Sequence, residues 1–181
     1  MKIGILGGSF NPAHEGHLEI SKMALKKFSL NCVWWSIAKK NPLKNSSSYV
    51  DYLQRLEYCR QYLKNNPKIK VNNIFPEAIY TYDFIKKIKK KYPRIKFYFI
   101  VGADCLENMH LWKNYKGLLK EVEFIIFARN EFFKKTCSFK AWSIYNNMNK
   151  VNNLPKFNIV RNRTINISSS QMRRPQHQLQ H

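Results

Sequence analysis

The chain lacks the features of several protein classes. Its 181 residues include only four cysteines, which lie far apart and form no C-x-x-C pair, so a zinc site or a disulfide framework is not expected. No apolar run approaches the roughly 18 residues that a membrane-spanning helix needs. The apolar run near the N-terminus is about four residues long, shorter than the roughly 7–15 of a secretory signal. We therefore expect a cytoplasmic protein with free thiols and no membrane association.

Acidic residues are also scarce, since 11 Asp and Glu stand against 32 Lys and Arg, for a formal charge of +21. Such a charge can indicate nucleic-acid binding. Lysine greatly outnumbers arginine, however, and asparagine is abundant, as in proteins from AT-rich genomes. The basic run at 86–91 spaces its apolar residues as a helix does, which favours a solvated helix face over a nucleic-acid patch. The charge would still speed encounters with anionic small molecules such as nucleotides.

The chain is long enough for one domain with a real core, and 44% of its residues are hydrophobic. Apolar strand-like segments alternate with helix-like ones, without an internal repeat or a linker. This alternation predicts an α/β fold, a Rossmann-like doubly wound parallel sheet of five to six strands with helices on both faces. Strands are expected at 3–6, 32–37, 69–73, 95–101, 122–127 and 157–160, helices at 15–28, 52–63, 82–92 and 138–148, and a mobile loop at 38–49.

Chemistry-bearing residues follow several of these strands. The first strand runs into Gly-Gly-Ser-Phe-Asn-Pro-Ala-His-Glu-Gly-His at 7–17, where glycines and a helix N-terminus favour a phosphate. His14 and His17 lie on one face of a helical turn. Lys44 follows the second strand, and Gly-Ala-Asp at 102–104 follows the fourth. Ligands of such sheets sit at the carboxyl ends of the strands, so these segments should converge.

A further candidate lies near the C-terminus, where Ile-Ser-Ser-Ser-Gln-Met-Arg occupies 167–173. The serines suit the N-terminus of a helix, and Arg173 one turn later could clamp a phosphate with two hydrogen bonds. An ordinary helix cap or a polar tail is the alternative.

The string at 7–17 resembles the nucleotidyltransferases with an H-x-G-H motif, and among these the bacterial nicotinate-nucleotide adenylyltransferases. The resemblance runs from residue 1 to about 173 and includes Gly102-Ala103-Asp104 followed by Trp112, Tyr80-Thr81-Tyr82-Asp83, and the Ile-Ser-Ser-Ser string, where the family usually has threonine at 170. Three further positions depart from the family pattern: Ile79 and Phe84 flank the second motif, and Leu43 replaces a histidine.

The resemblance implies roles for individual residues. Stacking on the nicotinate ring is implied for Trp112, with core packing as its alternative, and a phosphate contact for Lys44, with a solvated lysine as its alternative. Mg²⁺ would bridge the phosphates, with no metal ligands singled out in the chain. The implied catalytic residues are His14, His17 and Arg173; the ATP-binding residues are Gly7, Gly8, Ser9, Phe10, Gly102, Asp104, Arg129, Ser168 and Ser169; the substrate-binding residues are Asn11, Lys44, Arg55, Tyr80, Thr81 and Trp112.

The implied reaction joins nicotinate mononucleotide to ATP and yields deamido-NAD and pyrophosphate. A phosphopantetheine adenylyltransferase or a cytidylyltransferase, a basic nucleic-acid-binding protein, and an inactive nucleotide-binding remnant stay open as alternatives. The last is favoured by Pro175, which interrupts the helix that the family carries past its arginine, so 175–181 is expected to be a disordered tail of the single domain 1–181. The sequence does not decide between nicotinate and nicotinamide mononucleotide as the substrate, and a homo-oligomer is an open alternative to a monomer.

Overall fold

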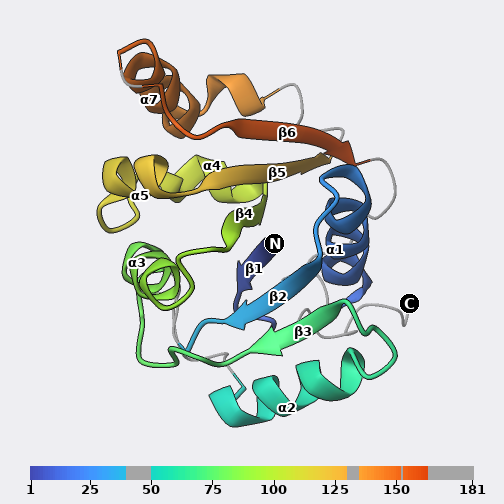
Figure 1. Ribbon diagram of the computed structural model, residues 1–181. Coiled ribbons are helices and arrows are strands. Elements are labelled where there is room, and N and C mark those ends of the chain that lie inside the picture. The colour runs from blue at the N-terminus through green and yellow to red at the C-terminus, as the bar shows by residue number, and fades with distance from the viewer. Residues whose placement is uncertain (40–49, 130–134, 152, 163–181) are drawn as a thin grey trace, which may run out of the picture.

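A computed structural model describes residues 1–39, 50–129, 135–151 and 153–162, with Arg129, Thr136 and Asn162 described by their backbone alone. Six parallel strands form one sheet in the order β3-β2-β1-β4-β5-β6 (Figure 1). This order confirms the predicted doubly wound parallel sheet. The strands are β1 (Lys2–Gly8), β2 (Cys32–Ile37), β3 (Ile69–Asn72), β4 (Lys96–Gly102), β5 (Glu123–Arg129) and β6 (Phe157–Asn162).

The helices connect these strands close to the predicted positions. Two short helices, α4 and α5, and a 3-10 turn, η2, were not predicted. None of the helices in the described part of the chain combines the length and apolar character that crossing a bilayer requires. The helices are α1 (Glu15–Lys27), α2 (Tyr52–Tyr62), α3 (Thr81–Lys91), α4 (Asp104–Met109), α5 (Tyr115–Glu121) and α7 (Lys140–Asn149), with η2 at Thr136–Ser138.

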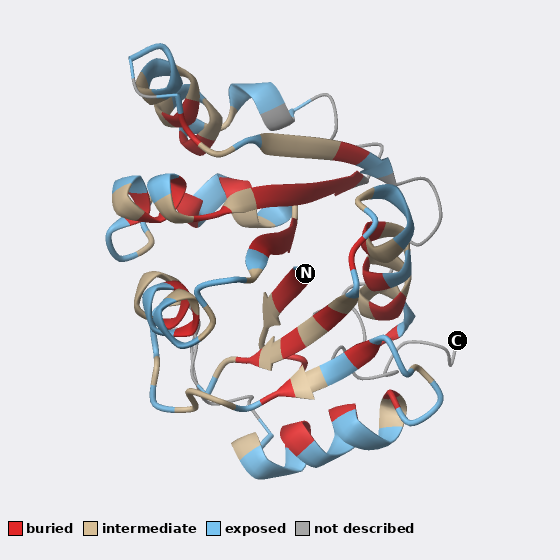
Figure 2. Cartoon of the chain, viewed as in Figure 1, coloured by how far each residue is buried: buried red, intermediate tan, exposed pale blue. Residues whose placement is uncertain are grey.

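The helices cover the sheet on both faces, each face with its own apolar core. On one face α1 and α2 pack on the sheet around Trp35, Ile100 and Phe127. On the other face α3, α4, α5 and α7 pack around Phe99, Phe124 and other strand residues. Figure 2 shows the buried residues concentrated along the strands and on the helix sides that face them. Burial on both faces explains why the strands read as continuous apolar runs.

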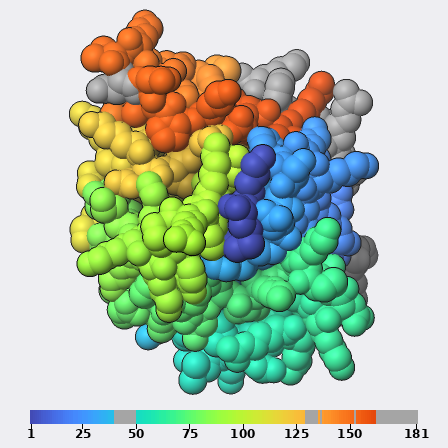
Figure 3. Space-filling view, in the orientation of Figure 1, coloured from blue at the N-terminus to red at the C-terminus, as the bar shows by residue number. Residues whose placement is uncertain are grey.

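β1 is an inner strand, and the change of direction in strand order falls between β1 and β4. In Figure 3 the dark blue N-terminal residues reach the surface between the light green and the mid-blue segments. Leu6 of β1 lies opposite Ile100 of β4, so the loops that follow Gly8 and Gly102 leave the sheet at the same level. This point is where doubly wound sheets bind ligands.

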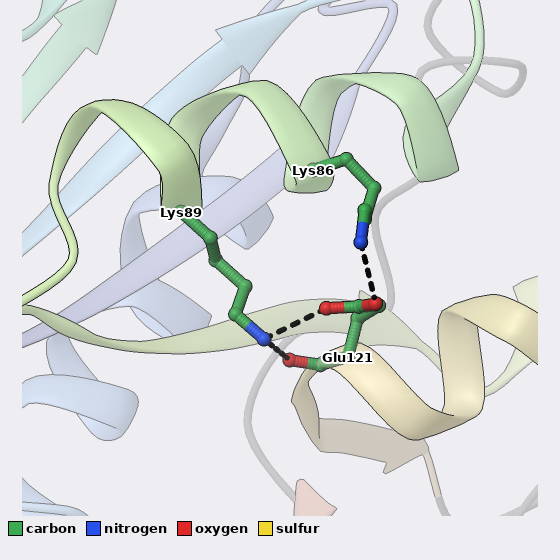
Figure 4. A network of polar contacts seen from close by, with 3 residues as sticks. All are labelled: Lys86, Lys89 and Glu121. Carbon is green, nitrogen blue, oxygen red and sulfur yellow. Dashed lines mark hydrogen bonds and ion pairs between the residues drawn. The ribbon is translucent and has the colours of Figure 1, made fainter.

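The lysine-rich helix α3 is held against α5 by ion pairs. Lys86 and Lys89 both contact the carboxylate of Glu121, at 3.2 and 2.8 Å, and Lys89 also donates to the Glu121 carbonyl at 2.8 Å (Figure 4). Burial would raise the pKa of Glu121, but the hydrogen bonds from the two lysines lower it. Lys87 contacts Glu77 at 2.6 Å. Three lysines of the run at 86–91 therefore pair with carboxylates, as on an ordinary helix surface.

Candidate active site

The glycines predicted to lie in the loop after the first strand belong to the strand itself. Gly7 and Gly8 are the last residues of β1, two residues beyond the predicted end of this strand. Gly7 lies under the ring of Phe99 on β4, and a Cβ atom at Gly7 would come within 2.8 Å of that ring. No described glycine has a positive φ; Phe10 has one instead, at 47°. An aromatic residue rarely adopts this backbone conformation, so the surrounding contacts must hold it there.

Two imidazoles face each other at the start of α1. His14 precedes the helix, His17 lies in its first turn, and their ring centroids are 3.8 Å apart. The backbone N–H of His14 donates to Nδ1 of His17 at 3.2 Å. Nδ1 is therefore an acceptor, and in the neutral ring the proton lies on Nε2. His17 thus has one hydrogen-bond donor left, on the opposite side of its ring.

Burial sets the charge of His17. Loss of hydration, the largest cause, and the neighbouring imidazole of His14 lower the pKa of His17 to about 3. At neutral pH the ring of His17 is uncharged. The neutral ring keeps one N–H group, on Nε2, which can donate a hydrogen bond to an anionic oxygen.

A buried aromatic group supports the imidazoles from below. The ring of Phe10 lies 4.7 Å from that of His17 and 4.7 Å from that of Trp35, on which it stacks. The indole N–H of Trp35 donates to the hydroxyl of Ser21 at 2.9 Å, and this hydroxyl donates to the carbonyl of His17 at 2.7 Å. Both Trp35 and Ser21 are fully buried. Neither residue was predicted to belong to the site, although the hydroxyl of Ser21 on the apolar face of α1 was a signal in the sequence.

The loop after β4 lies at the neighbouring strand end. Asp104 is exposed at the start of α4, and a Cβ atom at Gly102 would come within 2.3 Å of its carboxylate. The carboxylate thus occupies the space that the missing side chain of Gly102 leaves. Trp112, between α4 and α5, is half-buried with its ring edge-on to Phe99 at 6.3 Å. Since Phe99 also covers Gly7, Trp112 lies close to the end of β1.

The structure brings Tyr80 and Thr81 to the same region. Tyr80 precedes α3, and Thr81 is the first residue of that helix. Lys113, next to Trp112, lies 4.6 Å over the Tyr80 ring and pairs with Asp83 at 3.0 Å. The two segments that the resemblance assigns to the nicotinate pocket are therefore in contact.

Asn11 and Arg55 are buried. The side-chain oxygen of Asn11 accepts from the N–H of Val50 at 3.3 Å. The guanidinium of Arg55, in the first turn of α2, donates to the backbone carbonyls of Ser9 and Ala38, among others. The resemblance implied a substrate contact for Arg55, whereas these hydrogen bonds are to the protein backbone.

Several predicted site residues lie outside the described residues. These are Lys44, Ser168, Ser169 and Arg173. Arg129 is the last residue of β5, at the same edge of the sheet as the imidazoles, and its side chain is not described. The described part of the site thus comprises the loops after β1 and β4, the start of α3, and Trp112.

Similarity to known proteins identifies the family of the chain. The family model described as cytidylyltransferase-like matches residues 5–175. A protein of Pelagibacter ubique named "Probable nicotinate-nucleotide adenylyltransferase" is 40% identical over 176 residues, 96% of this chain and 92% of its own length. A protein of the same name from Ruegeria sp. is 36% identical over 131 residues, 71% of this chain and 68% of its own length.

Solved structures show the same fold. The nicotinic acid mononucleotide adenylyltransferase of Plasmodium falciparum, complexed with NaAD, superposes with a TM-score of 0.72 at 23% identity, over 94% of this chain and 81% of that one. On the strength of its sequence relatives, the chain belongs to the nicotinate-nucleotide adenylyltransferase family, within the cytidylyltransferase-like nucleotidyltransferases.

Proposed function

We propose that this chain transfers the adenylyl group of ATP to nicotinate mononucleotide. A phosphate oxygen of the mononucleotide attacks the α-phosphorus of ATP and forms the new P–O bond. The bond from that phosphorus to the bridging oxygen of the β-phosphate breaks, and pyrophosphate leaves with the electron pair. The products are deamido-NAD and pyrophosphate. The attacking phosphate is already ionised at neutral pH, so the step needs no general base and no covalent enzyme intermediate.

The observation that carries this proposal is the pair of close imidazoles at the junction of β1 and α1, in which the ring of His17 is neutral. His17 holds its donor proton on Nε2, and its low pKa keeps that ring uncharged. A fixed donor of this kind suits the charge that develops on the α-phosphate oxygens during displacement. The N-terminus of α1 adds its own partial positive charge. His14, whose ring lies 3.8 Å from that of His17, would donate to the same phosphate.

The remaining residues would divide between an ATP side and a mononucleotide side of the site. Gly8, Ser9 and Phe10 would line the ATP phosphates, with Ser168, Ser169, Arg129 and Arg173 completing their surroundings. Trp112 would stack on the nicotinate ring, bordered by Tyr80 and Thr81, while Asn11 and Lys44 would contact the mononucleotide.

Magnesium would arrive with the ATP phosphates. Within the described residues no three His, Cys, Asp or Glu side chains gather as a metal cluster. This arrangement fits an ion held mainly by phosphate and water, because Mg²⁺ commonly uses only one or two carboxylates in nucleotide sites. Asp104, exposed beside the end of β4, is the carboxylate that would hold it. When bound, the ion would neutralise phosphate charge.

The test is pyrophosphate release with ATP and a panel of acceptors: nicotinate mononucleotide, nicotinamide mononucleotide and phosphopantetheine. We expect release with the first. His17→Ala should lower turnover by about 10²–10³, the range for losing one preorganised donor. Lys22→Ala, on the outer side of the same helix, is the matched control and should keep full turnover. Release only with phosphopantetheine, or unchanged turnover in His17→Ala, would contradict the proposal.

A further inference from the structure

The side chain of Arg55 is the most heavily hydrogen-bonded cation among the described residues. Only 3% of its surface is exposed. Nε donates to the carbonyl of Val50 at 2.9 Å, Nη1 to those of Ser9 at 2.6 Å and Ala38 at 2.9 Å, and Nη2 to that of Lys39 at 3.0 Å. Four of its five N–H groups are thus committed to backbone oxygens. A buried guanidinium needs such partners, because an unpaired buried charge is very costly.

The four carbonyls come from three segments that meet near the imidazoles. Ser9 directly follows β1, and Ala38 and Lys39 directly follow β2. The N–H of Ala38 also donates to the carbonyl of Gly8 at 2.9 Å, so the two strand ends are joined where the guanidinium binds. Val50 immediately precedes α2, the helix that carries Arg55. One side chain therefore ties the loop after β1 to the loop after β2.

The contact with Ser9 leads directly to His17. The carbonyl of Ser9 and the N–H of Phe10 belong to one planar peptide unit, so a hydrogen bond to the carbonyl fixes the orientation of both. Phe10 continues in the left-handed region at φ 47°, which an aromatic residue does not adopt without support. Its ring then lies 4.7 Å from the ring of His17. Movement of the Ser9 carbonyl would be passed to the imidazole through Phe10.

We propose that Arg55 is a positioning residue: by holding the carbonyl of Ser9 it fixes Phe10 and, through Phe10, the ring of His17, without itself binding a phosphate. The inference rests on the proposed function for its kinetic consequence. A direct phosphate contact is disfavoured by the geometry, because four of the five N–H groups already bind carbonyls and the side chain is almost fully buried.

The experiment compares Arg55→Lys, Arg55→Met and Arg55→Ala with Arg60→Lys, a matched control on the exposed side of α2. An ammonium keeps the charge but has three N–H groups on one atom and cannot span four carbonyls. We expect Arg55→Lys and Arg55→Met to lower kcat by about 10–100-fold, with KM for both substrates changed less than threefold. Millimolar guanidinium should restore part of the activity of Arg55→Ala. Arg60→Lys should behave as the parent protein.

A phosphate ligand would give the opposite pattern. If Arg55→Lys kept near-normal kinetics while Arg55→Met raised KM for a substrate more than tenfold, the proposal would be overturned. Failure of all three variants to fold, judged by circular dichroism, would also overturn it in favour of a purely structural role.

A second readout does not depend on activity. NMR signals of the His17 ring in the substrate-free protein should shift in Arg55→Lys and stay in place in Arg60→Lys. Unmoved signals would refute the path through Phe10. If the parent protein released no pyrophosphate at all, the proposed function would fail, while this measurement would still decide the role of Arg55.

Discussion

Removing the hydroxyl of Ser21 should lower the stability of the protein, because this hydroxyl links Trp35 to His17 beneath the imidazoles. In Ser21→Ala the indole N–H of Trp35 loses its acceptor in a place where neither residue has exposed surface. A buried donor left without a partner costs about 1–3 kcal/mol. The carbonyl of His17 loses the hydroxyl but keeps its helical environment, so that loss adds little. We expect the free energy of unfolding to fall by about 2 kcal/mol, and Tm by roughly 4–8 °C for a domain of this size.

Trp35→Phe separates this penalty from ordinary loss of packing. It removes the indole N–H but leaves the hydroxyl of Ser21 its own acceptor, the carbonyl of His17. Its cost of about 2 kcal/mol comes from lost volume in the core. In the double variant no buried donor is left unpaired. The two costs should therefore not add: the double variant should be about 1–2 kcal/mol more stable than their sum predicts.

The assay is urea unfolding of the four proteins, followed by circular dichroism because two of them, Trp35→Phe and the double variant, lack Trp35. Additivity within about 0.5 kcal/mol would refute the reasoning, since independent sites add to that accuracy. A coupling of the expected sign would show that the Trp35–Ser21 hydrogen bond contributes to stability as the geometry indicates.

Two further predictions concern the charge of His17 and the fit of Asp104. Below pH 6.5 the unfolded chain binds a proton at this imidazole while the folded chain, with its pKa near 3, does not. As the pH is lowered from 6.5 to 3, this group should therefore reduce the free energy of unfolding by about 1.4 kcal/mol per pH unit. In His17→Gln the slope of unfolding free energy against pH should be smaller by the equivalent of about one proton. An unchanged slope would contradict the low pKa. Gly102→Ala should displace the carboxylate of Asp104, raising KM for ATP about threefold or more while the free energy of unfolding changes by less than about 1 kcal/mol. Asp104→Asn is its companion variant, and an unaltered KM in both would remove Asp104 from the ATP site.

Elements with a strong apolar pattern were predicted well from the sequence. The bounds of β2, Cys32–Ile37, match the prediction, and α1 ends one residue earlier than predicted. The short helices α4 and α5 were missed because they carry little local signal. Ala103 and Asn114 precede them without a side-chain cap, and Asn114 adopts a left-handed backbone. These helices form because Leu106, Met109 and Leu118 are buried against the sheet, which is a tertiary effect.

The site was predicted in outline rather than in its supporting contacts. The convergence of the loops after β1 and β4 follows from parallel strand order, which the alternation of segments indicates. The left-handed backbone of Phe10 could not be predicted from the sequence, because Gly7 and Gly8 lie nearby and glycine adopts that conformation far more readily. The hydrogen-bond partners of Arg55 could not be predicted either, because they include residues up to 46 positions away in the sequence. Sequence patterns report local periodicity, whereas these features depend on which segments meet in space.

The direction of β1 has a practical consequence for attaching the protein to a tag or a surface. Met1 is well exposed at the amino end of this strand, while the imidazoles follow its carboxyl end. Seven residues of extended chain separate the two by roughly 20 Å. An affinity tag or a surface tether attached at the N-terminus would therefore emerge on the side away from the nucleotides, and immobilised protein should keep open access for both substrates.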